Sequence, residues 1–397
     1  MTANVTYDAV VIGGGPAGAT SAADLAAAGR KVLLLDRAGR IKPCGGAVPP
    51  RLLADFEIPE SLLVARARSA RMIAPSSRNV DMPVGDGFVG MVDRDTFDEW
   101  LRTRAADQGA ERRSGTFEAI ERDEDGTAIV RYHSERGGRA ERVRARSVIG
   151  ADGARSAVAR QALATTRVPC VYAYHEVIRA PKSGTNGYEA GRCDVFYQGD
   201  LSPDFYAWVF PHGDTASVGV GSADKGFALR DAVSRMRRRN GLENCETLRR
   251  EGAPIPLKPL RRWDDRRDTI VTGDAAGVVA PASGEGIYYA MTSARFVAQS
   301  VDQFLATGNA RHLASARKRF MREHGRTFWV LGMMQHFWYK NDSRRERFVK
   351  ICADPDVQEL TWQAYMNKRL VRTRPGAHLR IFFKDTAHLL GLVPVAR

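Results

Sequence analysis

Cysteine is scarce in this sequence, and its spacing excludes two kinds of site. Five of the 397 residues are cysteines, and no two of them form a Cys-x-x-Cys pair. That pattern argues against a structural zinc site and against a disulfide framework. Long apolar runs are missing too, since none approaches the roughly 18 residues that a membrane-spanning helix needs. Without internal repeats or low-complexity tracts, and with 44% hydrophobic and 27% charged residues, the chain has the composition of a soluble globular protein.

A secretory leader and a nucleic-acid-binding module are also missing. The first predicted strand begins almost at Met1, which leaves no room for a signal peptide, so we expect a cytoplasmic protein. The net charge of +14 fits nucleic acid, an anionic membrane surface or an anionic substrate, and it equally fits a solvated basic surface. Because no nucleic-acid module is recognisable, we expect no nucleic-acid partner.

The sequence does contain a glycine-rich loop after a short apolar strand. Residues 7–12 are apolar and β-branched, as in a buried parallel strand, and Gly13, Gly15 and Gly18 follow in the GxGxxG positions. The first glycine permits a tight turn, the second lets the backbone approach a pyrophosphate, and the third lets helix and strand pack closely. The loop therefore predicts a dinucleotide site.

A helix, a second strand and an acid complete this pattern. Residues 17–28 are helix-forming, and the N–H groups and positive dipole end at the start of that helix would face the phosphates. A strand over 31–35 leads to Asp36, about twenty residues after the glycines, where an acid binds ribose hydroxyls. The order of these parts predicts that a Rossmann-like unit begins at the N-terminus.

Patterns beyond Asp36 predict the remaining elements and their organisation. The predicted elements are a helix over 92–101 with Asp93 as its N-cap, a hairpin of strands over 115–122 and 128–133, a short buried strand over 146–153, a β-sheet region over 168–260 with one basic helix near 227–240, a buried strand over 269–274, a helix over 287–305 and helices after 309. This order predicts an α/β fold, in which a Rossmann-like domain carries an inserted antiparallel β-sheet substrate domain and a helical C-terminal region. The expected domains are 1–167 (with part of the substrate domain near 45–90), 168–262, 263–308 and 309–397.

Three separated motifs carry a family resemblance, namely GGGPAG from Gly13, GADGARS from Gly150 and VTGDAAG from Val271. Together they resemble the FAD flavoproteins that include para-hydroxybenzoate hydroxylase. Within that group the chain resembles the geranylgeranyl reductase family, in its chlorophyll and bacteriochlorophyll branch, over nearly its full length. The segments that carry this second resemblance are 43–47 (PCGGA), 206–211 (YAWVFP), 281–291 (PASGEGIYYAM), 337–339 and 361–365.

The resemblance implies FAD as the cofactor and implies which residues hold it. In this family, an Asp-Gly pair closes the dinucleotide site, a second acid accepts hydrogen bonds from sugar hydroxyls, and an arginine at a helix start contacts the FAD. Small residues after the cysteine of PCGGA would let the backbone approach the flavin ring, and a helix N-terminus would stabilise negative charge on the reduced ring. The expected FAD-binding residues are Gly13, Gly15, Ala17, Gly18, Asp36, Arg37, Gly45, Gly46, Ala47, Arg94, Asp152, Gly153, Gly273, Asp274, Gly286 and Ile287.

Cys44 is the cysteine that the resemblance places beside the flavin. A neighbouring cation such as Lys42 favours a thiolate, so Cys44 is a candidate proton donor or a switch on substrate entry; alternatively, it is a small buried side chain.

Alternate aromatic residues in the YAWVFP segment share one face of a strand that we expect to end at Phe210-Pro211, and they line either an isoprenoid tunnel or an ordinary core. The three are Tyr206, Trp208 and Phe210. Neither His175 nor His212 has a partner at ligand spacing, so we expect both to be structural.

The resemblance predicts a reductase that saturates three of the four double bonds of a geranylgeranyl chain to give phytyl. The substrate would be geranylgeranyl diphosphate, the geranylgeranyl ester of bacteriochlorophyll or both. The expected reductant is NADPH, and reduced ferredoxin is the alternative electron source. No second Rossmann fingerprint is present, so NADPH would dock transiently. Two alternatives are an FAD monooxygenase or halogenase on an aromatic substrate, although no WxWxIP signature is found, and a non-catalytic flavin-binding subunit among pigment-synthesis enzymes.

Two further segments have open interpretations. The stretch 328–339 is apolar on most sides, which fits either a buried helix or a second wall of the tunnel. Near the C-terminus, apolar residues recur at helical spacing over 379–393 with cations between them. That segment either packs on the protein's own core or lies in the interface of the inner (photosynthetic) membrane, and its charges exclude a spanning helix.

Overall fold

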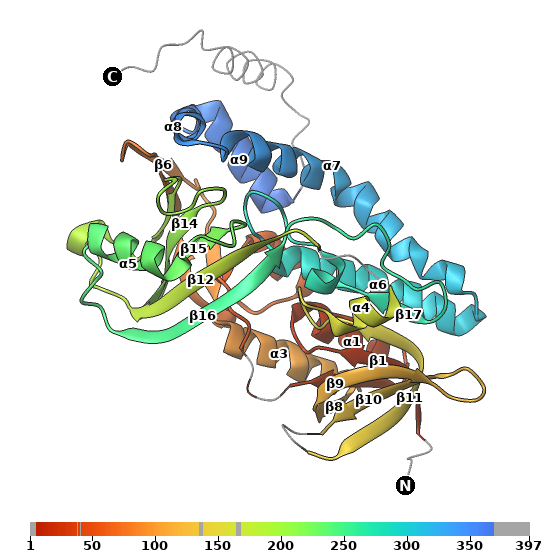
Figure 1. Cartoon of the computed structure of the whole chain (residues 1–397). Helices are drawn as coiled ribbons and strands as arrows, with labels where there is room; N and C mark the ends of the chain where they lie inside the picture. Colours follow the sequence, from red (N-terminus) through yellow and green to blue (C-terminus); the bar gives the residue numbers. More distant parts are fainter. Residues whose placement is uncertain (1–4, 38, 40, 135–137, 164–167, 369–397) are drawn as a thin grey trace. The chain divides into compact units, whose positions relative to one another are not determined.

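The computed structural model describes residues 5–368 except 38, 40, 135–137 and 164–167 (Figure 1). The chain forms two compact units, each built from three separate segments. The first unit comprises Met1–Lys42, Arg94–Cys170 and Pro254–Trp329. The second unit comprises Pro43–Asp93, Val171–Ala253 and Val330–Arg397.

The first unit contains the predicted Rossmann-like arrangement. β1 (Thr6–Ile12) and β2 (Val32–Asp36) are parallel neighbours, and α1 (Pro16–Ala27) connects them. Both strands are apolar and almost fully buried, as strands covered on both faces must be. β11 (Ala140–Gly150) lies parallel to the other edge of β1, and the sheet order is β8-β2-β1-β11-β10-β9, with β17 (Thr269–Val271) paired to β11. The predicted strand–loop–helix–strand order is confirmed.

An antiparallel hairpin extends this sheet. β9 (Thr116–Arg122) and β10 (Ala128–His133) form the predicted hairpin, and β10 pairs with β11. β11 is longer than the strand that we expected, because its first half pairs with β10 as well as leading into the buried parallel half. Half-exposed charged residues in that first half hid the strand from an interpretation based on apolar runs.

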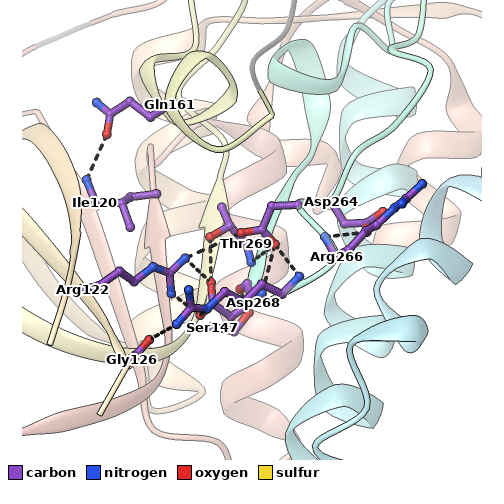
Figure 2. A network of polar contacts seen from close by, with 11 residues as sticks. Ile120, Arg122, Gly126, Ser147, Gln161, Asp264, Arg266, Asp268 and Thr269 are labelled. Carbon is purple, nitrogen blue, oxygen red and sulfur yellow. Dashed lines mark hydrogen bonds and ion pairs between the residues drawn. The ribbon is translucent and has the colours of Figure 1, made fainter. Parts of the chain in front are cut away.

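Asp268 connects the hairpin to the strand β17 (Figure 2). The guanidinium of Arg122 forms a two-pronged ion pair with the Asp268 carboxylate, with Nη2 donating to Oδ1 at 2.9 Å. The Asp268 backbone carbonyl accepts the hydroxyl of Ser147 at 2.9 Å, and Thr269 Oγ1 donates to the carboxylate at 3.1 Å. These contacts at the buried Asp268 fix the start of β17. The other end of the same strand leads into the motif at Gly273.

Alanines bring two helices of the first unit close together. Ala17 on α1 and Ala290 and Ala294 on α6 (Ile287–Thr307) form one buried cluster, and Ser21 Oγ donates to the Ala294 carbonyl at 3.3 Å. The predicted helix over 287–305 is therefore confirmed. The other elements are α3 (Arg94–Asp107), β8 (Glu111–Ser114), α4 (Ala157–Ala162) and the short 3-10 helices Gly273–Ala276 and Ala310–His312.

The second unit is built on a large, mainly antiparallel sheet in the order β16-β12-β15-β14-β13-β5-β6. Its strands are β5 (Ser69–Ile73), β6 (Asn79–Pro83), β12 (Cys170–Arg179), β13 (Arg192–Phe196), β14 (Ala207–His212), β15 (Thr215–Ser222) and β16 (Thr247–Pro256). One pair, β5 with β13, is parallel. The basic helix α5 (Leu229–Arg239) packs on this sheet (Figure 1). Val218 and Val220 of β15 and Met236 of α5 belong to one buried apolar cluster. The predicted sheet and its basic helix are confirmed.

Pro211 does not end its strand, contrary to our expectation. β14 continues to His212, and Pro211 pairs in register with Ala216 of β15. On its other side β14 pairs with β13 only from Ala207 to Val209. At Pro211 the strand therefore has one neighbour, and a residue without an N–H is tolerated at such an edge.

The remaining elements include a three-stranded sheet and the helices after residue 309. They are β3 (Ala47–Val48), β4 (Leu63–Ala67), β7 (Val89–Val92), α2 (Pro50–Phe56), α7 (Ala314–Trp338), α8 (Asp342–Ile351), α9 (Pro355–Asn367) and the 3-10 helices Glu60–Leu62 and Thr185–Gly187. Of the two interpretations of the stretch 328–339, a fully buried helix is wrong, because Trp329 is 66% exposed and Met333 is 50% exposed; the tunnel wall stays a prediction. In the part of the chain that the structure describes, no helix is both long and apolar enough to cross a membrane. The segment 379–393 lies outside the described residues.

Candidate cofactor and substrate sites

Two glycines of the GxGxxG loop are required by the protein's own packing. Gly13 has φ +105°, and a Cβ there would lie 2.4 Å from the carbonyl oxygen of Ala151. A Cβ on Gly18 would lie 1.7 Å from the carbonyl oxygen of Gly13. Both positions therefore exclude any side chain, as the tight turn and the close helix–strand packing of this motif demand.

Gly15 is different, because neither its backbone nor its neighbours require glycine. It caps the N-terminus of α1 with φ −74° and ψ −175°, which any residue can adopt. Among the described residues, the nearest atom to a Cβ there would be Nη2 of Arg94, 3.9 Å away. The space above Gly15 is thus open, lies at a helix N-terminus and has a guanidinium beside it, which are the properties that a pyrophosphate needs.

Arg94 is held in place by a buried ion pair. It is the first residue of α3 and is 5% exposed. Its Nε donates to Asp98 Oδ1 at 2.8 Å and its Nη2 to Asp98 Oδ2 at 2.6 Å. This fork fixes the guanidinium in one orientation, so it presents a preorganised cation near Gly15.

Asp36 ends β2 beside the same loop. Burial raises the pKa of Asp36, whereas the backbone N–H of Gly14 and the charge of Arg102 act in the opposite direction. Arg102 Nη1 lies 3.4 Å from Asp36 Oδ2 and donates to the Gly14 carbonyl at 3.2 Å. Arg102 therefore ties the carboxylate to the loop, and our interpretation of the sequence missed it. Arg37, which follows, is exposed.

Asp152 caps a helix. Its carboxylate accepts from Ser156 Oγ at 2.5 Å and from the N–H groups of Ala157 and Val158 at 2.6 and 3.2 Å, at the start of α4. Burial raises the pKa of Asp152, and these donors oppose that shift. Gly153 follows with φ +84°, and a Cβ there would meet no atom of the described residues within 4 Å, so the backbone at this position is open.

Asp274 is paired with Lys42 in the first unit. The Lys42 ammonium forms an ion pair with the Asp274 carboxylate, whose side chain is 8% exposed. Gly286 caps α6 next to this carboxylate, since a Cβ on Gly286 would lie 3.7 Å from Asp274 Oδ1. Gly273 has φ +62°, and the following helix begins at the buried Ile287. The charge of Lys42, which we expected to act on Cys44, serves Asp274.

Cys44 lies in a glycine turn of the second unit. The Gly46 N–H donates to Cys44 Sγ at 3.4 Å, so the sulfur is a hydrogen-bond acceptor and its own hydrogen stays free to point elsewhere. Gly46 has φ +72°, and a Cβ there would lie 2.5 Å from His212 Nε2. The residue that follows, Ala47, is half-buried and begins β3. His212 therefore packs against the turn, a contact that local sequence does not reveal.

The predicted aromatic face exists and lies beside this turn. Tyr206 and Trp208 have ring centroids 5.9 Å apart, and those of Trp208 and Phe210 are 6.1 Å apart. A Cβ on Gly45 would lie 3.3 Å from Phe210 and 3.9 Å from Trp208 Nε1. Cys44, Gly45, Gly46, Ala47 and the three aromatic residues thus belong to the second unit, while the other predicted residues belong to the first unit.

Family models match three parts of the chain. Residues 11–51 match the model of an NAD(P)-binding Rossmann-like domain, and residues 65–177 match the model of an FAD binding domain. Residues 225–385 match the lycopene cyclase protein model. These matches identify FAD as the cofactor of the protein.

Relatives extend over the whole chain. The sequence is 55% identical to a geranylgeranyl diphosphate reductase from Rhodobacter capsulatus, over 98% of both chains. It is 35% identical to a chloroplastic geranylgeranyl diphosphate reductase from Oryza sativa, over 98% of this chain and 87% of the relative. A crystal structure of a geranylgeranyl bacteriochlorophyll reductase-like protein from Thermoplasma acidophilum has the same fold, with TM-score 0.80 and 21% identity over 95% of this chain and 99% of that one. The chain therefore belongs to the geranylgeranyl diphosphate reductase family.

Proposed function

We propose that this protein is an FAD-dependent reductase that saturates double bonds of a geranylgeranyl chain. The observation that carries the proposal is the end-to-end similarity to the Rhodobacter capsulatus geranylgeranyl diphosphate reductase. The first unit supports it with residues that suit a dinucleotide, namely the open backbone at Gly15, the fixed guanidinium of Arg94 and the acid–lysine pair at Asp274. The monooxygenase alternative is weaker, because the relatives that match over the full length are reductases.

FAD, when bound and reduced, supplies a hydride to one carbon of the alkene. The other carbon needs a proton, and we assign that proton to the thiol of Cys44. Its sulfur accepts the Gly46 N–H, which leaves the S–H free to point at a substrate. After the transfer, the thiolate regains a proton from solvent, so each step adds one hydride and one proton to the double bond.

The residues proposed to hold the isoprenoid chain are Trp208 and Phe210 of β14 and Tyr206, which directly precedes this strand. Tyr206 and Trp208 are both less than 10% exposed, and Phe210 is half-buried, so together they offer an apolar surface with few polar atoms. An apolar surface suits a hydrocarbon chain and keeps water from the reacting carbons. The diphosphate and the pigment ester both carry such a chain, and the net charge of +14 favours the anionic diphosphate.

The direct test is anaerobic turnover of the FAD-loaded protein with NADPH and geranylgeranyl diphosphate. We expect products that are heavier by two mass units per step, formed without oxygen. A protein that consumes NADPH only when oxygen is present, and that leaves the chain unsaturated, would instead be a monooxygenase. A protein that binds FAD and performs neither reaction would be a non-catalytic flavin subunit.

NADPH is the proposed electron source, and it would dock transiently because the sequence has one GxGxxG loop. Stopped-flow absorbance follows the bleaching of bound flavin after mixing with NADPH or with reduced ferredoxin. We expect bleaching by NADPH. Bleaching by ferredoxin alone would contradict this proposal without affecting the assignment of the substrate.

We also propose peripheral association with an anionic membrane through the C-terminal segment. The alternating apolar and cationic residues over 379–393 support it. Co-sedimentation with anionic liposomes, with and without salt, compares the full chain with one truncated before Pro375. Equal binding of the two chains, provided that both are folded, would show that the segment does not capture the membrane.

A further inference from the structure

A row of three residues crosses the second unit's sheet beside the Cys44 turn. His175 of β12 and Trp208 of β14 are both in register with Gly219 of β15, which lies between them. A Cβ on Gly219 would lie 2.2 Å from Trp208 Cζ2 and 2.6 Å from His175 Cβ. Glycine at this position therefore lets the indole and the imidazole approach each other over the middle strand, on one face of the sheet.

A buried hydrogen-bond chain joins these side chains. Trp208 Nε1 donates to Ser217 Oγ at 3.0 Å, and Ser217 Oγ lies 2.9 Å from His175 Nδ1. His175 Nε2 lies 3.1 Å from Glu251 Oε2. Trp208, Ser217 and His175 are each at most 5% exposed. A chain of this kind stays stable in a core only when every donor finds an acceptor.

The hydrogens that each group carries determine which group donates and which accepts along this hydrogen-bond chain. The indole of Trp208 can only donate, so Ser217 accepts from it and can give its own hydrogen to His175 Nδ1. Nδ1 is then an acceptor, and the neutral imidazole carries its hydrogen on Nε2, where the Glu251 carboxylate accepts it. In this arrangement all three donors are satisfied. At the end of the hydrogen-bond chain farthest from Trp208, Arg249 Nε lies 3.1 Å from Glu251 Oε1 and forms an ion pair with it.

Serine, histidine and glutamate are also the residue types of a hydrolytic triad, but this geometry does not serve hydrolysis. The Ser217 oxygen already accepts the Trp208 N–H, and the residue is 2% exposed. A nucleophile must reach its substrate, and this hydroxyl faces protein atoms. This hydrogen-bond chain therefore orients the Trp208 side chain and does not cleave a bond of a substrate.

Trp208 is the member of the hydrogen-bond chain that belongs to the proposed substrate face. Its ring lies between those of Tyr206 and Phe210, and its Nε1 faces the turn at Gly45. An indole can rotate about two side-chain bonds. The hydrogen bond from Trp208 Nε1 to Ser217 Oγ adds a directional contact to the packing of the rings and so favours one orientation.

We propose that Ser217, His175 and Glu251 are positioning residues, which fix the orientation of the Trp208 indole so that it forms a wall for the geranylgeranyl chain beside the Cys44 turn. This inference rests on the proposed function. It predicts that the three residues act through Trp208 on the affinity for the geranylgeranyl substrate. The FAD content of the protein should not depend on them.

The test removes the hydroxyl and then restores it. Ser217→Ala leaves Trp208 Nε1 and His175 Nδ1 without their partner, and we expect KM for geranylgeranyl diphosphate to rise about five- to tenfold, with kcat within about twofold and full FAD content. Ser217→Thr keeps a hydroxyl and should restore most of the lost affinity. In 15N-tryptophan spectra, the Trp208 Nε1–H resonance should shift in the alanine variant and return in the threonine variant.

The matched control is Ser222→Ala, on the same strand and also buried, whose hydroxyl donates to Asp204 at 2.9 Å. It should leave KM and the Trp208 resonance unchanged. Equal KM values for wild type and Ser217→Ala would overturn the inference, as would an equal rise in KM for Ser222→Ala. If wild-type protein does not reduce the substrate at all, the proposed function has failed, which is a different result from wild-type turnover with unchanged KM in the variants.

Discussion

Gly15 of the first unit and two glycines of the second unit, Gly46 and Gly219, have opposite surroundings. Gly15, in the first unit, has open space above it, with the guanidinium of Arg94 as the nearest described group at 3.9 Å. Gly46 and Gly219, in the second unit, are covered by the protein's own rings, since a Cβ would lie 2.5 Å from His212 and 2.2 Å from Trp208. The first kind of glycine leaves room for a ligand, whereas the second kind lets aromatic side chains pack on the backbone.

This difference separates cofactor binding from substrate positioning. A side chain added at an open glycine should displace the ligand and leave the fold intact. A side chain added at a covered glycine should instead strain the core, because rings and backbone must move. Substitutions at Gly15 and Gly219 test this distinction, and substitutions at Cys44 and His212 test the chemistry and the packing of the second unit; the expected effects decrease in that order.

Gly15→Phe should abolish flavin binding. The φ and ψ of Gly15 suit any residue, so we expect the free energy of unfolding to change by no more than about 1 kcal/mol. The benzyl group would, however, fill the space proposed for the pyrophosphate, and the purified protein should be colourless. Absorbance at the flavin band and thermal unfolding are measured on the same sample. Full FAD occupancy would show that the cofactor does not pass over Gly15.

Gly219→Ala should destabilise the second unit by about 2–3 kcal/mol, because its Cβ would overlap the Trp208 indole. Flavin content should be unchanged. Gly191→Ala is the control, since a Cβ there meets no described atom within 4 Å, and it should cost less than about 0.5 kcal/mol. Urea unfolding of both variants gives the comparison, and equal midpoints would mean that the sheet accommodates the methyl group without strain.

Cys44→Ser should keep FAD but slow alkene reduction by at least about tenfold, equivalent to about 1.4 kcal/mol of barrier. Serine is a much weaker acid than cysteine, so it is a poorer proton donor in the same turn. Cys245→Ser, a half-buried cysteine elsewhere in the second unit, serves as the control. Single-turnover rates with geranylgeranyl diphosphate decide the matter: a rate within about twofold of wild type would leave Cys44 a packing residue.

His212 should make stability depend on pH. Burial lowers the pKa of His212 from 6.5, the Phe210 carbonyl and Asp93 oppose this shift, and Arg249 reinforces it. Because the folded state binds this proton less readily than the unfolded state, the contribution is present above about pH 6.5 and is lost as the pH falls through the folded pKa. His212→Gln should therefore show a shallower loss of stability on acidification. Identical slopes for the two proteins would remove His212 from this role.

Short-range patterns predicted the first unit well. The loop at Gly13, helix α1, strand β2 and Asp36 lie within a few tens of residues of one another, so spacing alone places them together. The hairpin, the basic helix α5 and helix α6 were also predicted, because each has a local periodic pattern or turn signal.

Contacts between residues distant in the chain could not be predicted. Lys42 and Asp274 are 232 positions apart, and His175 and Glu251 are 76 apart, so only the folded sheets and loops bring them together. His175 had no partner at ligand spacing, yet the register of β12 and β15 places it opposite Gly219. Pairing across strands depends on register, which the sequence pattern of one strand does not reveal.

Some expectations stay predictions. The domain boundaries after residues 167, 262 and 308 belong to this group, as do the individual FAD, catalytic and substrate residues. Asp152 illustrates why a motif alone does not assign a role, since its carboxylate caps α4 through Ser156 and two backbone N–H groups. A substitution at Asp152 would therefore disturb the helix as well as any bound dinucleotide.

The most direct test of the central claim is a single turnover without oxygen and without NADPH. The FAD-loaded protein is reduced with dithionite, freed of excess reductant and mixed with geranylgeranyl diphosphate while the flavin absorbance is followed. The account predicts that the flavin reoxidises and that the chain gains two mass units for each flavin oxidised. Flavin that stays reduced beside an unchanged chain would contradict the claim that this protein reduces geranylgeranyl double bonds.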